Sequence, residues 1–132
     1  MKIIVFSGYF LVFTGLIHSF AGIILGWSVL LEMHEEFWFA TTIIDSRIQF
    51  DREAIVWFLN VGFLWMLIGW MLQKSANQGF IPPESLGWGL FFMGFLTVII
   101  MPISGAYLLI FQGAMLIYGT RKAQSNSKKA TA

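Results

Sequence analysis

Four apolar segments alternate with short polar ones along this chain. They span about residues 3 to 31, 54 to 72, 84 to 101 and 104 to 119. We separate the last two at Pro102 and Gly105, because one helix over residues 86 to 119 would extend about 51 Å, against a hydrocarbon core of about 30 Å. The pattern predicts an all-α membrane protein with four transmembrane helices in an up-down bundle.

The composition supports a lipid environment. Of the 132 residues, 58% are hydrophobic and only 11% are charged, whereas about 25% are charged in ordinary soluble domains. The expected surroundings are therefore a lipid bilayer. The net charge of +1 excludes nucleic acid as an expected partner. The absence of cysteine excludes disulfides and thiolate metal sites.

The basic residues predict the orientation of the chain. With four spans, one side of the membrane holds Lys2, Lys74, Arg121, Lys122, Lys128 and Lys129. The other side holds only Arg47 and Arg52. By the positive-inside rule, both termini are cytoplasmic, and we expect a multi-pass protein of the inner membrane. The basic, polar residues 120 to 132 are predicted to be a disordered cytoplasmic tail.

The beginning of the chain has an alternative interpretation. Lys2 and the small residues of "SFA" before Gly22 are also typical of a cleavable secretory signal. The apolar segment continues to Leu31, however, which is longer than the apolar region of such signals. We therefore expect a transmembrane helix here.

Glycines repeat every seven residues in the first segment, at Gly8, Gly15 and Gly22. Gly62 and Gly69 form a shorter repeat of the same kind in the second segment. Small residues at this spacing allow membrane helices to approach closely, so packing accounts for both repeats.

His18 is the only ionisable side chain well inside an apolar segment. From the predicted outer boundary, His18 lies roughly 13 Å deep, Asn60 roughly 9 Å and Gln112 roughly 12 Å. These three side chains are predicted to form the floor of an outward-facing polar pocket. Alternatively, a neutral His18 hydrogen-bonds to Asn60, Gln112 or a backbone carbonyl and only joins helices.

The charged stretch Asp51, Arg52 and Glu53 precedes the second segment. Asp51 is predicted to be the N-cap of that helix, and Glu53 to favour its dipole. A cation at this position opposes the dipole, so Arg52 should pair with carboxylates of the preceding loop or hold an anionic group. We favour a role at the pocket mouth, where Arg52→Gln would impair function without lowering stability.

The predicted ligand-binding residues are therefore His18, Arg52, Glu53, Trp57, Asn60, Ser104 and Gln112. If the protein is an enzyme, His18 and Glu53 are the catalytic candidates, with Asp51 as an alternative acid. We predict no metal site, because His34 in "EMHEE" lacks the further ligands that metal centres need. No cofactor is expected, and two histidines as haem ligands are disfavoured because His34 lies in a loop.

Three stretches resemble the DUF6463 family of small bacterial proteins, which are of unknown function and are predicted to have four membrane helices. They are "FTGLIHSFAG", "DREAIVWFLNVG" with the following "LIGW", and "PPESLGWGLFFMGFLTVIIMPISGAYLL". The matching positions are His18, Gly22, Arg52, Glu53, Trp57, Phe58, Leu86, Gly87, Met101, Pro102, Ser104 and Gly105. Ala106 and Tyr107 replace a frequent Phe-Trp pair. The resemblance implies fold and topology, and it implies no chemistry.

Three functional hypotheses follow. The first is binding or transport of a lipophilic small molecule in the outward-facing pocket. A homo-oligomer would suit transport, since four helices alone make a narrow path. The second is a membrane-embedded isomerase or hydrolase that acts on a lipid-like substrate. The third is an accessory membrane subunit without a site of its own.

Overall fold

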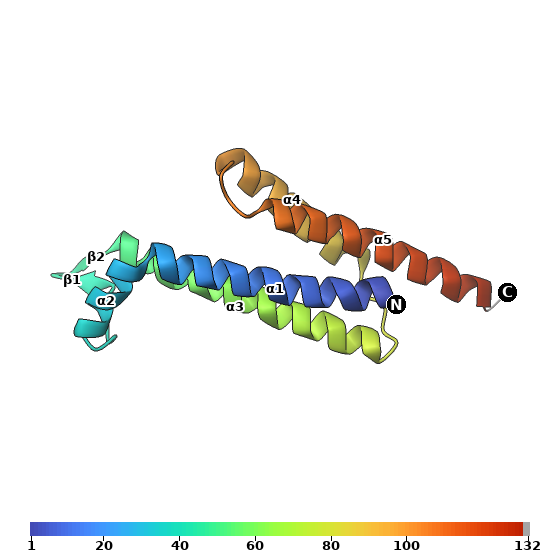
Figure 1. Cartoon of the computed structure of the whole chain (residues 1–132), viewed down its shortest axis with the longest axis horizontal. Helices are drawn as coiled ribbons and strands as arrows, with labels where there is room; N and C mark the ends of the chain where they lie inside the picture. The colour runs from blue at the N-terminus through green and yellow to red at the C-terminus, as the bar shows by residue number, and fades with distance from the viewer. Residues whose placement is uncertain (131–132) are drawn as a thin grey trace.

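The computed structural model describes residues 1–130 and is built from five helices and one small hairpin (Figure 1). In chain order the elements are α1 (Lys2–Leu25), α2 (Trp27–Glu35), β1 (Ile43–Ile44), β2 (Arg47–Ile48), α3 (Phe50–Asn77), α4 (Glu84–Ile100) and α5 (Tyr107–Ala130). The two strands are antiparallel and pair Ile43 with Ile48 and Ile44 with Arg47. The predicted helical class is confirmed.

The first predicted helix is in fact two helices. Gly26 separates them with φ −96° and ψ 13°, far from the ψ of about −42° of a regular helix. Beyond this residue α2 turns away from the axis of α1 (Figure 1). The sequence pattern did not reveal the break, because the apolar residues continue across it without interruption.

The second predicted helix begins earlier than expected. α3 starts at Phe50, and Gln49 is its N-cap, with extended backbone angles and no side-chain capping bond. The prediction of Asp51 as N-cap was therefore wrong. Asp51 and Glu53 lie within the first turn, where negative charge is favourable to the helix dipole.

The last helix differs most from its predicted range. α5 starts at Tyr107, because residues 102–106 form the turn after α4. It continues to Ala130, so the prediction of a disordered tail was wrong for residues 120–130. Burial of Ala123 and an ion pair of 2.6 Å between Arg121 and Glu84 hold this part of the helix in place. Residues 131–132 of the predicted tail lie outside the described residues.

The helices form two antiparallel hairpins, α1 with α3 and α4 with α5 (Figure 1). In the first hairpin the two glycine repeats face each other. A Cβ on Gly8 would lie 2.7 Å from the carbonyl oxygen of Gly69, and one on Gly15 would lie 2.6 Å from that of Gly62. The packing role predicted for both repeats is therefore confirmed.

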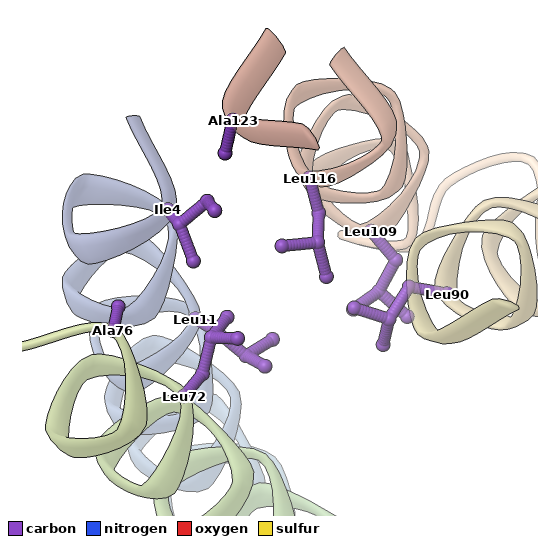
Figure 2. Packing of buried hydrophobic residues seen from close by; sticks show 8 residues of the cluster. All are labelled: Ile4, Leu11, Leu72, Ala76, Leu90, Leu109, Leu116 and Ala123. Carbon is purple, nitrogen blue, oxygen red and sulfur yellow. The ribbon is translucent and has the colours of Figure 1, made fainter. Parts of the chain in front are cut away.

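The two hairpins meet mainly through α1 and α5. Buried apolar side chains from all four long helices gather there, as Figure 2 shows: Ile4, Leu11, Leu72, Ala76, Leu90, Leu109, Leu116 and Ala123. α3 makes no comparable contact with α4 or α5. The arrangement is thus more open than the predicted bundle, because the contact involves the first half of α1 only.

Two helices, α1 and α3, are long and apolar enough to cross a membrane, and α4 is apolar but shorter, with 17 residues. Their side chains are distributed in the opposite way to those of a soluble protein. Ser7 and Thr14 of α1 are buried, whereas Phe13 and Phe20 are 58% and 66% exposed. Large apolar side chains on the outside and small or polar ones inside are favourable in lipid and unfavourable in water.

Candidate functional site

Arg52 lies in the first turn of α3 and is buried. Its two terminal nitrogens donate to the two carboxylate oxygens of Glu36, over 2.6 and 3.0 Å. Nη1 also donates to the carbonyl oxygen of Thr41, over 2.7 Å, and Nη2 donates to Glu32 over 3.4 Å. Of the two roles considered for Arg52, the structure therefore shows pairing with carboxylates of the preceding loop.

The acidic partners of Arg52 come from the end of α2. Glu32 and Glu36 are four residues apart, so their side chains lie on the same side of the helical turn. The hydrogen bond from Arg52 lowers the pKa of Glu36 below its ordinary value. Glu36 is therefore ionised at neutral pH, and the paired charges tie the loop to the start of α3.

The loop between α2 and α3 has an unusual backbone. Phe37, Trp38 and Ala40 have positive φ angles of 60°, 65° and 56°, which bulky residues rarely adopt. Asp45 and Ser46 also have positive φ, as the two-residue turn between β1 and β2 requires. Such a loop needs tertiary contacts to keep its shape, and Arg52 supplies them.

His18 lies at the contact of α1 with α3. Its Nε2 is 3.1 Å from the carbonyl oxygen of Phe58, and its ring is stacked on the Phe58 ring with centroids 3.8 Å apart. The absence of a side chain at Gly62 permits this approach, because a Cβ there would lie 3.3 Å from the imidazole ring. This geometry favours the interpretation of His18 as a residue that joins two helices. Within residues 1–130, no carboxylate is hydrogen-bonded to it.

Gln112 is also buried, but in a different place. Its Nε2 donates to the carbonyl oxygen and the hydroxyl of Ser7, over 2.8 and 2.6 Å. Ser7 precedes His18 by eleven residues, about 16 Å along the helix. The prediction that Gln112 and His18 lie at similar depths was therefore wrong, because α5 is shifted along α1 toward its N-terminal end.

The other predicted site residues are spread over the surface. Asn60 and Trp57 are exposed, and Glu53 is half-buried. Ser104 lies in the turn after α4, where its hydroxyl accepts from the backbone N–H of Ala106 over 3.4 Å. The structure thus does not bring the predicted residues together in one outward-facing pocket.

Two hollows of the described chain lie elsewhere, one between the start of α1 and the end of α3 and the other between α4 and α5. The larger measures about 610 Å³ and is lined by Met1, Lys2, Val5, Phe6, Tyr9, Ala76, Asn77 and Gly79. A smaller one of about 280 Å³ is lined by Trp88, Phe91, Ala114, Ile117, Tyr118 and Arg121. The sequence reasoning missed both. The spacing of Lys2, Val5, Phe6 and Tyr9, at i, i+3, i+4 and i+7, indicates only that these side chains share one face of a helix.

The profile of a family of unknown function, DUF6463, covers residues 2–123, which is nearly the whole described chain. No curated protein and no solved structure matches the chain.

Proposed function

The chain belongs to the DUF6463 family, and we propose that it is a multi-pass inner-membrane protein that binds a lipophilic amphiphile. In this proposal α1, α3, α4 and α5 are the four spans, and both termini are cytoplasmic. The length of α1 and α3 supports two of the spans directly. The 17 residues of α4 reach about 26 Å, near the lower limit for a span.

The exposed side chains support membrane residence of the second hairpin as well. α4 exposes an apolar surface, whose exposure to water would be unfavourable. It consists of Phe95, Leu96, Ile99 and Ile100, which are 49% to 78% exposed. The charged residues of α5 begin only at Arg121, so its first 14 residues, about 21 Å, carry no charge and form the shortest of the four proposed spans. With this topology, the distribution of basic residues favours an outer location of α2 and the strand hairpin.

Reporter fusions test this topology. A periplasm-dependent enzyme fused after residue 44 should be active, whereas a cytoplasm-dependent fluorescent protein should fold after residue 78 and at the C-terminus. The reason is the charge distribution, with Lys74, Arg121 and Lys122 on the retained side. A C-terminal fusion that is active only in the periplasm would contradict the four-span topology.

The ligand part of the proposal depends on one observation, the hollow of about 610 Å³ between the start of α1 and the end of α3. Its volume lies in the range of small-molecule sites, about 300 to 1,000 Å³. Val5, Phe6 and Ala76 supply an apolar wall, and Lys2 and Asn77 supply polar groups at its edge. A molecule with an apolar chain and an anionic head would match both parts at the level of the membrane surface.

A thermal shift in detergent tests the ligand class. Oleate should raise the unfolding temperature of the native chain, and oleyl alcohol should raise it less, because only oleate carries a charge for Lys2. Lys2→Gln should reduce the oleate effect, and the matched variant Lys129→Gln, which removes a charge that does not line the hollow, should not. Equal responses in the two variants would exclude Lys2 as the residue that binds the anionic head.

A further inference from the structure

Asn60 is a polar residue at an unusual position in α3. It lies in the apolar middle of a helix that is long enough to span a membrane, yet it is exposed. Within residues 1–130 its amide makes no hydrogen bond to another side chain, and its position on the helix explains why. At about 100° per residue, Asn60 is about 160° away from Gly62, which faces α1. In a lone chain, the amide would point into lipid.

Asn60 belongs to a regular pattern on this outer face. The half-buried or exposed residues Glu53, Trp57, Asn60, Leu64, Leu67 and Met71 follow each other at alternating spacings of four and three. This is the spacing of a left-handed helix pair, in which such residues interlock with those of a second helix. The residues that pack on α1, including Ile55, Gly62 and Gly69, lie on the opposite side.

An amide that faces lipid is unfavourable, because hydrocarbon offers it no hydrogen bonds. Asparagine in a membrane helix is therefore satisfied by a polar group on another helix. No helix within residues 1–130 supplies one, since α3 has extensive contacts only with α1 and, at its start, with α2. The partner must come from another molecule.

We propose that this partner is a second copy of the chain, with α3 as the interface and Asn60 hydrogen-bonded to Asn60 of the second copy. An amide has both donors and an acceptor, so two of them satisfy each other across a two-fold axis. Copies inserted in the same orientation hold Asn60 at the same depth, whereas another protein would need its own polar group at that depth. This inference requires the proposed membrane residence, but it does not require a ligand.

The flanking residues fit the same arrangement. Trp57 and Leu64 lie one turn to either side of Asn60 and are 66% and 50% exposed, so they are free to interlock with their counterparts. The charged positions are at the two ends of the helix, with Glu53 in the first turn and Lys74 in the last. There the like charges of two copies would be in water and screened by salt.

Cross-linking through single cysteines tests the interface, and the native chain has no cysteine that would interfere. Leu64→Cys should give a disulfide-linked dimer when membranes are oxidised. The control is Phe13→Cys on α1, where Phe13 is 58% exposed. α1 and α3 are antiparallel and Gly15 is opposite Gly62, so Phe13 lies at about the same depth as Leu64. This variant should remain monomeric on the same gel.

Asn60→Leu should then weaken association in the membrane about threefold to twentyfold, the range for single hydrogen bonds between membrane helices. Energy transfer between labelled copies, measured against dilution in lipid, gives this ratio. An Asn60→Leu chain that associates as tightly as the native one would overturn the proposal, as would equal cross-linking at positions 13 and 64. The reporter fusions are an independent control. If they contradict the four-span topology, the proposed membrane residence is wrong. If they support it and no dimer forms, only the proposed α3 interface is excluded.

Discussion

Arg52→Gln is expected to detach the loop between α2 and α3 from the start of α3 and to lower the unfolding temperature. Glutamine has one short amide group, which cannot reach Glu36 and the Thr41 carbonyl oxygen together as the guanidinium does. The buried carbonyl would lose its donor, and Glu32 and Glu36 would repel each other without a cation between them. Chymotrypsin added to the protein in detergent should then cleave faster at Phe37 and Phe39, which are 88% and 89% exposed.

Two variants serve as controls for this result. Arg47→Gln removes the same charge from an exposed position of the same loop and should change neither the unfolding temperature nor the cleavage rate. Arg52→Lys should have an intermediate effect, because lysine keeps the charge and lacks the planar fork that engages both oxygens of Glu36. If Arg52→Gln behaves like Arg47→Gln, the ion pairs do not hold the loop.

Acid should reproduce the effect of Arg52→Gln in the native chain. The pKa of Glu36 is lowered in the folded protein relative to its ordinary value of 4.5, chiefly by the hydrogen bond from Arg52. The stabilisation is therefore complete above about pH 4.5 and is lost as the pH falls through the lowered pKa. In Arg52→Gln this part of the acid dependence should disappear.

The expected loss of stability replaces the effect inferred from the sequence, which was impaired function without loss of stability. The opposition between Arg52 and the helix dipole correctly indicated that this cation needs a partner. The sequence could not identify that partner, because Glu32 and Glu36 come into reach only when Gly26 turns α2 away from α1. That turn depends on one backbone conformation and leaves no trace in the hydropathy pattern.

The location of the helices along the sequence was easier to predict than the helices against which each of them packs. Segments of about twenty apolar residues predict helices wherever the chain meets lipid, and the glycine repeats predict which side of α1 and α3 is close-packed. In a membrane protein, however, the lipid-facing side and the buried side are both apolar. Asn60 and Gln112 were therefore assigned to the same interior, although one faces outward and the other is bonded to Ser7.

The shift of one helix along another could not be predicted from the sequence either. Hydropathy determines which residues enter the membrane, but not how far one helix slides along another. α5 takes its position from Leu116 and Ala123, which pack with Ile4 near the start of α1 (Figure 2). That shift carries Gln112 away from His18 and buries Thr120 and Ala123, in a stretch whose polar composition alone favoured disorder.

Gly15→Ala is expected to destabilise the hairpin of α1 and α3 by about 1 to 3 kcal/mol, as overpacking of a tight contact does. The added Cβ would lie 2.6 Å from the carbonyl oxygen of Gly62 and 3.0 Å from the backbone nitrogen of Met66. These are backbone atoms, so the contact is relieved only if the two helices move apart and lose the packing along their length. Unfolding in detergent, followed by circular dichroism, measures the change.

The matched control is Gly89→Ala in α4, where an added Cβ would meet nothing within 4 Å. There alanine should stabilise the chain by about 0.5 to 1 kcal/mol, because it loses less conformational freedom than glycine when a helix forms. The two variants make the same chemical change and the same change in helix propensity. Stability changes of opposite sign would therefore show the effect of the close approach of α1 and α3. If both variants are stabilised, the glycines of α1 are not needed for close packing, and the separation of the hairpin helices would have to be larger than the structure shows.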